Sequence, residues 1–236
     1  AGFSRRVVAG DLARRLAADV RRDVAYAAGR RASALPSGRT SYRRLADYEA
    51  DMKRLAQERA DLVRPVVASV RSLEGRPIAG IEISEDVHAT GDGKPVFLML
   101  GVHHAREWPS GEHAIEFAHD LVRNFGADER ITGLLRRVRV LVVPVVNVDG
   151  FNVSREALVD LGDLGRALGG ETGYSLTTLA DPFLAYKRRN CRLLGTLPTI
   201  PGLCALAPSR LTGVDLNRNY GKFWGGPGAS ALPLWD

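Results

Sequence analysis

The sequence predicts an α/β fold: a three-layer sandwich with helices packed on a mixed parallel and antiparallel β-sheet. Two apolar runs, at 95–100 and 139–146, are typical of strands inside a sheet, because a strand covered on both faces carries few polar residues. Helical patterns alternate with these runs, and that alternation predicts the fold class. With 236 residues and 45% hydrophobic content, the chain can bury one sizeable core.

The N-terminal region carries a helical pattern of its own. Residues 11–34 place leucine, valine or alanine at every fourth position with arginine pairs between them, which predicts a helix with one apolar stripe. The stretch 35–40 is rich in proline, glycine and serine and is typical of a linker. We therefore expect an N-terminal helical arm over residues 1–38 and the main domain over residues 39–236.

A second helix is predicted over residues 45–63, where apolar side chains repeat at helical spacing. Thr40 or Ser41 can cap its start, and Pro65 limits its end. The alternating segment 78–83 predicts a strand.

Two further strands and two helices are predicted between residues 91 and 146. Gly-Asp-Gly at 91–93 is a hairpin signal that leads into the apolar run at 95–100, which we interpret as a buried strand. A helix is predicted over 110–125 and a short helical piece over 131–135. The run at 139–146 predicts a central strand, in which Pro144 must fall at a bulge or at the strand's end.

Residues 151–186 are rich in glycine and only weakly amphipathic. Two interpretations are open: an insertion that shapes access to a nearby site, or a tolerated surface loop. Connecting segments usually run over the surface, so we favour the loop.

Composition and charge exclude several classes. The formal net charge of +6 is carried mostly by arginines that are scattered among acidic residues, which does not favour nucleic-acid binding. No run of about 18 apolar residues occurs, so no membrane-spanning helix is predicted. The chain opens without an apolar targeting segment, and we expect any signal peptide to have been removed.

The two cysteines, Cys191 and Cys204, are close in the sequence. They are either two ordinary thiols or a disulfide, and closing such a loop stabilises a protein by about 3 kcal/mol. Pro198, Pro201 and Gly202 between them indicate an irregular loop, so we favour the disulfide and an oxidising compartment.

The stretch 101–108 carries the first chemistry. It reads Gly-Val-His-His-Ala-Arg-Glu-Trp and lies between a predicted strand and a predicted helix. His104 and Glu107 offer an imidazole and a carboxylate, two of the three protein ligands that a catalytic zinc ion needs. His103 also has helical spacing to Glu107, so spacing alone leaves both histidines open. Because neighbours on a strand point to opposite faces, only one of them can face the site.

Four stretches together resemble the zinc carboxypeptidases of the funnelin family, in the family's order. They are Ser72-Leu73-Glu74-Gly75-Arg76-Pro77-Ile78, the stretch 101–108, Asn147-Val148-Asp149-Gly150 with valine in place of the usual proline, and Gly213-Val214-Asp215-Leu216-Asn217-Arg218-Asn219. The resemblance implies the family's α/β sandwich, a zinc cofactor and release of C-terminal residues from peptides. It also implies that the strands at 78–83 and 95–100 are antiparallel neighbours.

The resemblance assigns the metal site to His104 and Glu107, and leaves His103 as a packed or supporting residue. Asp215 matches the carboxylate that receives the free ring N–H of the zinc-bound histidine. Arg188 matches the arginine that stabilises the oxyanion of the tetrahedral intermediate. Lys187 or Arg189 takes that role if the register is shifted by one.

Substrate binding is also implied by resemblance. Asn217 and Arg218 match the residues that hold the substrate's C-terminal carboxylate, and the planar fork of an arginine suits a carboxylate. Arg106 matches an arginine of the outer subsites. We therefore expect the partners to be peptide or protein C-termini, with neither nucleic acid nor membrane, and a secreted monomer.

Other family residues are absent from the sequence. The third zinc ligand, a histidine, and the general-base glutamate both follow the Asn-Arg motif in the family, whereas all five histidines here precede it and no glutamate follows Asp215. His113 lies on the outgoing helix and is not expected to replace the ligand. We expect a catalytic domain that is incomplete at its C-terminus and, as it stands, inactive.

Three readings remain open. The first is a metallocarboxypeptidase, and the second is a non-catalytic fragment or module that binds peptide C-termini. The third, a nucleic-acid-binding protein, has only the net charge behind it. The residues 1–38 are then a pro-segment remnant or a surface arm. The preferred C-terminal residue is left open, as is the choice between protein and bacterial cell-wall peptide as substrate.

Overall fold

The computed structural model of the chain describes residues 33–156, 187–192, 204 and 213–221, with five helical positions at 14, 18, 21, 22 and 25. Most of the predicted helix at 11–34 and of the predicted loop at 151–186 lies outside the described residues. The division into an arm and a main domain therefore stays a prediction.

The core of the protein is a mixed four-stranded sheet. Its strands are β1 (Val63–Arg71), β2 (Pro77–Ile83), β3 (Val96–Leu100) and β4 (Arg139–Val143), in the order β1-β2-β4-β3. β1 pairs with β2 and β2 with β4 in antiparallel fashion, while β3 pairs with β4 in parallel. The predicted α/β class with a mixed sheet is confirmed.

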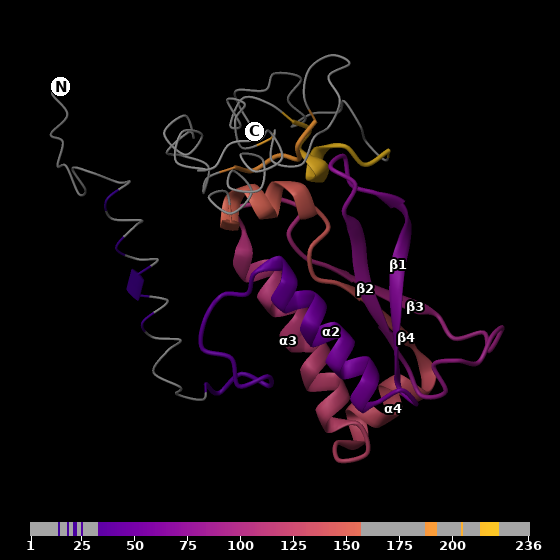
Figure 1. Cartoon of the computed structure of the whole chain (residues 1–236). Helices are drawn as coiled ribbons and strands as arrows, with labels where there is room; N and C mark the ends of the chain where they lie inside the picture. The colour runs from indigo at the N-terminus through magenta and orange to yellow at the C-terminus, as the bar shows by residue number, and fades with distance from the viewer. Residues whose placement is uncertain are drawn as a thin grey trace, which may run out of the picture.

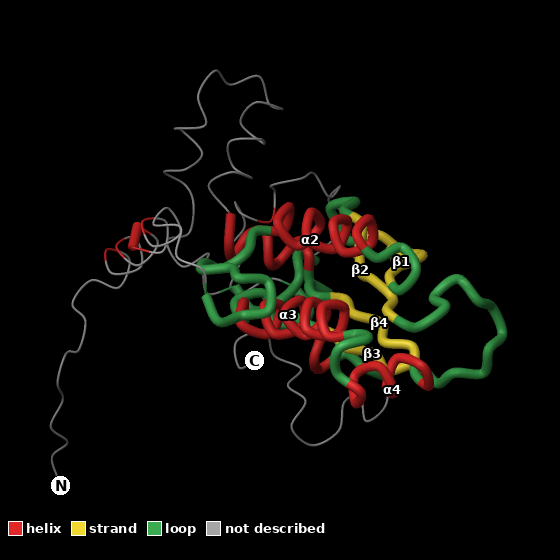
Figure 2. Tube along the Cα trace, turned by 90° about the horizontal axis from the view of Figure 1, so that it is seen from below, coloured by secondary structure: helices red, strands yellow, loops and turns green. Residues whose placement is uncertain are grey.

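Helices α2 (Leu45–Glu58) and α3 (Trp108–Asn124) lie side by side along one face of this sheet, and α4 (Glu129–Arg137) packs near one end of α3 (Figures 1 and 2). Their apolar faces and the inner sheet face form one core, which includes Tyr48, Ile81, Ile115 and Val142. The three helices follow the amphipathic patterns of the sequence. No helix among the described residues is both long enough and apolar enough to cross a membrane.

The predicted neighbour relation of β2 and β3 is wrong, because β4 lies between them. β4 takes the central position, with β2 on one side and β3 on the other, and it is largely buried. β3 then joins its outer side in parallel, and a parallel connection needs a crossover, which α3 and α4 provide. Gly91 and Gly93 both have positive φ, so the segment turns as expected, but it belongs to a long loop instead of a hairpin.

That loop is held down by one arginine. The Arg139 guanidinium donates to the carboxylate of Asp92 at 2.8 Å, to the carbonyl of Ala89 at 2.6 Å and to the carbonyl of Val87 at 3.1 Å. It also pairs with Glu82 on β2 at 2.5 Å. These bonds fix the loop across the end of the sheet.

The predicted end of the second helix is also wrong. The helix stops at Glu58, and the β-branched segment that begins at Val63 is strand β1. Pro65 fits there because β1 is an edge strand, where a missing N–H breaks no inner ladder. The helix start differs as well: Arg44 is the cap residue, and its N–H donates to the Asp47 carboxylate at 2.9 Å.

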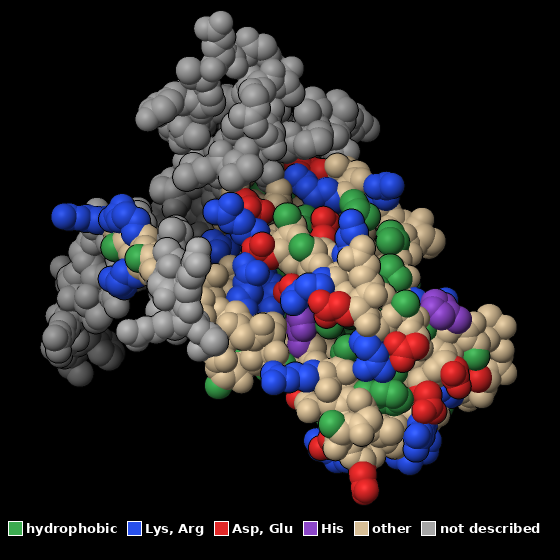
Figure 3. Space-filling view, turned by 60° about the horizontal axis from the view of Figure 1, so that its bottom comes forward, with side chains coloured by type: hydrophobic (Ala, Val, Ile, Leu, Met, Phe, Trp, Pro, Cys, Tyr) green, Lys and Arg blue, Asp and Glu red, His purple; other side chains and the backbone are tan. Residues whose placement is uncertain are grey.

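β3 is not buried as predicted. Val96, Phe97 and Leu98 are 61%, 50% and 51% exposed, because β3 is an edge strand and β4 is its one neighbour among the described residues. β4 itself is largely buried and ends just before Pro144, as expected. Acidic and basic side chains lie among one another on the face of the described residues that Figure 3 draws.

Candidate metal and carboxylate-binding site

The loop after β3 is shaped by two backbone features. Gly101 lies so close to the neighbouring chain that a Cβ there would be 2.3 Å from the Pro144 carbonyl oxygen. Val102 is buried at a φ of 47°, an uncommon conformation for a β-branched residue, and its N–H donates to Ser110 Oγ at 2.9 Å. Such strained residues gather at functional sites, where surrounding structure holds them in place.

His104 lies between two carboxylates. Its Nδ1 is 2.8 Å from Glu107 Oε1, and its Nε2 is 3.2 Å from Asp215 Oδ1. The Nε2 atom is buried and has no partner in hydrogen-bond geometry, so Asp215 is its close neighbour but not an aligned acceptor. The tertiary structure thus joins the predicted pair His104 and Glu107 to Asp215, more than a hundred residues away in sequence.

Arg188 reaches the same carboxylate. Its Nε donates to Asp215 Oδ2 at 2.7 Å, and its Nη1 lies 3.8 Å from Glu107 Oε1. Burial opposes ionisation of Asp215, but the hydrogen bond and charge of Arg188, with the charge of His104, lower the pKa of its carboxyl group. Asp215 is therefore an anion at neutral pH and can accept bonds from Arg188 and from a protonated Nε2 of His104.

His103 and His104 do not lie on a strand, because residues 101–107 form bends and turns. The alternation used to separate them does not apply. His103 instead extends to Tyr220, with Nε2 2.6 Å from the phenol oxygen. Burial, together with the charge of His104, lowers the pKa of His103. His103 thus contacts the segment after the Asn-Arg motif.

The predicted substrate-binding residues lie in the short 3-10 helix η2 (Leu216–Arg218), whose cap residue is Asp215. Asp215 accepts the Asn217 N–H at 2.9 Å, which ties the motif to the histidine. Asn217 and Arg218 are both exposed, and Arg106 is exposed beside Glu107 in the sequence. These side chains stand at the surface next to the buried group.

Asn147 is a buried residue beside the site whose contacts the sequence did not reveal. Its Nδ2 donates to the carbonyl oxygen of His103 at 3.1 Å and approaches that of Arg188 at 3.5 Å. Its Oδ1 accepts the Gly150 N–H at 3.1 Å. One buried amide therefore joins the histidine loop to the Arg188 segment, and the family-like Asn-Val-Asp-Gly stretch was the signal that could have indicated it.

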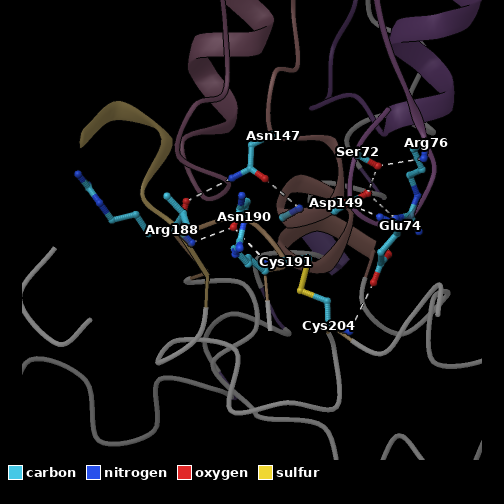
Figure 4. The surroundings of a disulfide bond; sticks show 12 residues. Ser72, Glu74, Arg76, Asn147, Asp149, Arg188, Asn190, Cys191 and Cys204 are labelled. Carbon is cyan, nitrogen blue, oxygen red and sulfur yellow. Dashed lines mark hydrogen bonds and ion pairs between the residues drawn. A yellow bond between two sulfur atoms is a disulfide. The ribbon is translucent and has the colours of Figure 1, made fainter. Parts of the chain in front are cut away.

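A disulfide fixes the other end of the Arg188 segment. Cys191 and Cys204 are bonded in the structure, and Figure 4 shows that Glu74 and Asp149 lie beside them. Glu74 Oε1 accepts the Cys204 N–H at 3.4 Å. Asp149 accepts the Glu74 N–H at 3.0 Å and Ser72 Oγ at 2.7 Å. The first and third family-like stretches therefore meet at the disulfide.

Lys187 is fully buried in this region, and its titration gives a testable pH dependence. Burial, with the charge of Arg189, lowers the pKa of Lys187 to about 8, while Glu74 acts in the opposite sense. The unfolded chain keeps the ordinary value of 10.5, so between pH 8 and 10.5 the unfolded state binds more protons. The free energy of unfolding must rise with pH in that window.

We expect a rise of about 2 kcal/mol between pH 8 and 10 in urea titrations, and none in Lys187→Met. Measurements stop at pH 10 because burial raises the pKa of Tyr48, and ionisation of the unfolded tyrosine then lowers stability. A rise of equal size in the variant assigns the effect to another group.

The residues present fit part of a zinc site. An imidazole nitrogen and a carboxylate oxygen face each other at His104 and Glu107, and both are zinc ligands. The buried Nε2 on the far side of the ring faces Asp215, the usual arrangement that leaves the other ring nitrogen as the ligand. The fit therefore covers two protein ligands and one supporting carboxylate.

The chain is similar in sequence to known proteins of one family. A family model described as zinc carboxypeptidase matches residues 48–236. Carboxypeptidase A2 of Rattus norvegicus is 29% identical over 197 residues, which cover 83% of this chain and 36% of the relative.

Solved structures show the same fold. Thrombin-activatable fibrinolysis inhibitor superposes with a TM-score of 0.62 at 22% identity, over 92% of this chain and 44% of the other. Carboxypeptidase A of Helicoverpa armigera gives a TM-score of 0.58 at 24% identity, over 93% of this chain and 44% of the other. The chain spans less than half the length of the proteins it matches here.

Proposed function

Because this chain belongs to the zinc carboxypeptidase family, we propose that it forms part of a zinc metallocarboxypeptidase, a hydrolase that releases C-terminal residues from peptides. The observation that carries the proposal is the convergence on His104: Glu107 at one ring nitrogen, Asp215 at the other, and Arg188 bonded to Asp215. Four residues from three separate segments make one polar group.

His104 Nδ1 and the Glu107 carboxylate would hold the metal. The chemistry that zinc supplies when bound is polarisation of the scissile carbonyl and activation of a water molecule. Asp215 orients the imidazole through Nε2 and raises its basicity, which strengthens the metal bond. Arg188 donates a hydrogen bond to Asp215 in this structure. In the reaction its guanidinium would donate to the oxyanion that develops on the scissile carbonyl.

Asn217 and Arg218 bind the substrate's free carboxylate in this proposal, and Arg106 contacts residues further from the cleaved bond. Their exposure supports the assignment, because a peptide end can approach them from solvent. The position of Asp215 at the cap of η2 sets the spacing between the carboxylate anchor and His104. An anchor for a free carboxylate at a fixed place beside the metal ligands would select the last residue of a peptide.

The substitution Arg218→Ala tests the anchor. It removes a charge-assisted bidentate pair, so we expect kcat/KM for peptides with a free C-terminus to fall by about 30- to 1000-fold, equivalent to about 2–4 kcal/mol. The assay uses the polypeptide that the gene of this chain encodes, with chelator-treated enzyme as the zinc control. Amidated peptides should be poor substrates of both forms. An equal loss for free and amidated peptides contradicts the role in carboxylate binding.

A second candidate is a module that binds peptide C-termini without cleaving them. It is favoured by the metal site itself, because His104 and Glu107 are the two zinc ligands that the described residues bring together there. The two candidates separate in the same assay: binding of peptides with a free carboxylate, together with no release of their last residue by the gene-encoded polypeptide, supports the module.

We also propose a secreted protein that acts as a monomer on peptide or protein C-termini, without nucleic acid. The disulfide supports an oxidising compartment, and on the face drawn in Figure 3 acidic side chains lie among the basic ones, which does not favour nucleic acid. The arm at 1–38 is a pro-segment remnant in this proposal.

A further inference from the structure

A second group of metal-binding side chains lies away from His104, around the disulfide. Within the described part of the chain, Glu74, Cys191 and Cys204 each offer one ligand atom, and these atoms lie within 4.8 Å of one another. All three residues are buried. They come from three separate segments, which the fold brings together (Figure 4).

The spacing suits one small cation. Atoms no more than 4.8 Å apart can all be within about 2.8 Å of one point, near the 2.0–2.3 Å of zinc bonds to oxygen and sulfur. Two sulfurs on a tetrahedral zinc ion are about 3.8 Å apart. The two Cα atoms are 5.4 Å apart. After reduction of the disulfide, rotation of the two cysteine side chains can therefore bring the sulfurs to that separation.

The carboxylate is already fixed in place. Glu74 Oε2 pairs with Arg76, and Glu74 Oε1 accepts the Cys204 N–H. Asp149 accepts hydrogen bonds from the Glu74 N–H and from the Arg76 guanidinium. Such outer contacts orient a metal ligand before the metal binds. Arg76 does not compete for Oε1.

The charges around Cys191, Cys204 and Glu74 are also compatible with a bound divalent cation. A disulfide is neutral, and two thiolates with one divalent cation are neutral together, so the exchange leaves the balance among Glu74, Asp149, Arg76 and Lys187 unchanged. Nearby cations lower the pKa of thiols and favour the thiolates that bind metal. Lys187 is within electrostatic reach of Glu74.

We propose that the dithiol form of this chain binds one zinc ion through Cys191 Sγ, Cys204 Sγ and the Glu74 carboxylate. A phosphine reductant and water convert the disulfide into two thiols and a phosphine oxide, with both thiol protons from water. Zinc then displaces the two protons and forms two zinc–sulfur bonds. The metal thereby makes the same cross-link that the disulfide makes under oxidising conditions.

This cross-link bears on the Arg188 segment. Cys191 lies three residues after Arg188, and Asn190 bonds to Val214 in both directions, with distances of 3.1 Å and 2.8 Å. A link from Cys191 to Cys204, whether by the disulfide or through the metal ion, keeps that segment beside Asp215. The proposal does not depend on the proposed carboxypeptidase activity, because it concerns a different set of ligands.

The test is a titration of the 236-residue chain with Co²⁺ after reduction by a phosphine under argon. We expect one equivalent to bind with an intense near-ultraviolet thiolate-to-cobalt band, which Zn²⁺ removes by displacement. The oxidised chain gives no band. Zinc should also raise the Tm of the reduced chain, and a chelator should reverse the rise.

Variants identify the ligands. Cys191→Ser and Cys204→Ser should abolish the band, and Glu74→Gln should weaken cobalt binding at least about tenfold. The matched carboxylate control is Glu107→Gln, alone and with His104→Ala, which should leave the band unchanged. Absence of the band from the reduced chain overturns the proposal, and so does a reduced chain that stays unfolded by circular dichroism with excess zinc. Unchanged affinity in Glu74→Gln overturns the three-ligand site.

Discussion

Zinc titrated into the oxidised 236-residue chain is expected to bind at least about a hundredfold more weakly than in a site with three protein ligands. Zinc sites with four protein ligands bind with about 10–16 kcal/mol, which is roughly 3–4 kcal/mol for each ligand, and 2.8 kcal/mol is a factor of a hundred. His104 and Glu107 are the two metal ligands that the chain offers here. The sequence has no histidine after His119.

Hydrolysis is expected to be absent from the same sample. The activated water needs a base to take its proton, and no glutamate follows Asp215, where the resemblance requires it. Calorimetry gives the zinc affinity, and chromatography of peptide digests gives C-terminal release. His104→Ala should remove the remaining zinc binding, while His113→Ala, an exposed histidine on α3, should not change it. Stoichiometric tight zinc with chelator-sensitive release refutes both expectations.

The substitution Arg43→Ala is expected to lower the free energy of unfolding by about 3–5 kcal/mol. Arg43 has no exposed surface, and its guanidinium pairs with Asp51 at 2.7 Å, Glu116 at 2.8 Å and Glu112. Removing it leaves three carboxylates with little exposure and without this cation. Arg43→Lys should recover part of the loss, because one ammonium cannot meet three carboxylates in the geometry of a guanidinium.

The loss should depend on pH in a defined direction. Burial by itself raises the pKa of the Asp51 carboxyl group. His119, whose Nε2 lies 3.6 Å from Asp51 Oδ2, and the hydrogen bonds from Arg43 and Arg54 lower it by more, so the folded pKa lies below its ordinary value. A carboxyl group with a lowered folded pKa stabilises the protein above its unfolded pKa, and that contribution is lost as pH falls through the folded value. Arg43→Ala lacks much of this contribution at every pH. The difference in the free energy of unfolding between the wild type and the variant should therefore become smaller as the pH falls below about 4.

Urea unfolding at pH 7 and pH 3 measures both effects. The matched control is Arg44→Ala, the exposed neighbour whose pair with Glu156 spans 3.5 Å and which should cost less than about 1 kcal/mol. A loss for Arg43→Ala that is no larger than that of the control, or one that grows at low pH, contradicts the account of a buried ion network.

The sequence alone determined much of the fold. Helical periodicity located α2, α3 and α4, because a helix that buries one face must repeat its apolar residues at that spacing. The apolar run that became β4 predicted a central strand, since only a strand enclosed on both faces tolerates so few polar residues. The same reading failed for β3, whose equally apolar residues lie on an edge strand. Composition indicates that a strand is apolar, but not how many neighbours cover it.

Ligand types and their spacing also indicated Glu107 with either His103 or His104. The family resemblance then selected His104 and the Asp-Leu-Asn-Arg stretch. Only the tertiary structure decided how they meet. The strand order places β4 between β2 and β3, so β3 joins it through a crossover and not through the hairpin that Gly91 and Gly93 suggested. That arrangement brings the loop after β3 to the segments at 187–192 and 213–221. Asp215 thus reaches the second nitrogen of His104, and Asn147 joins two carbonyl groups from distant segments. Contacts between residues so far apart depend on the packing of the whole sheet, and no local pattern encodes them.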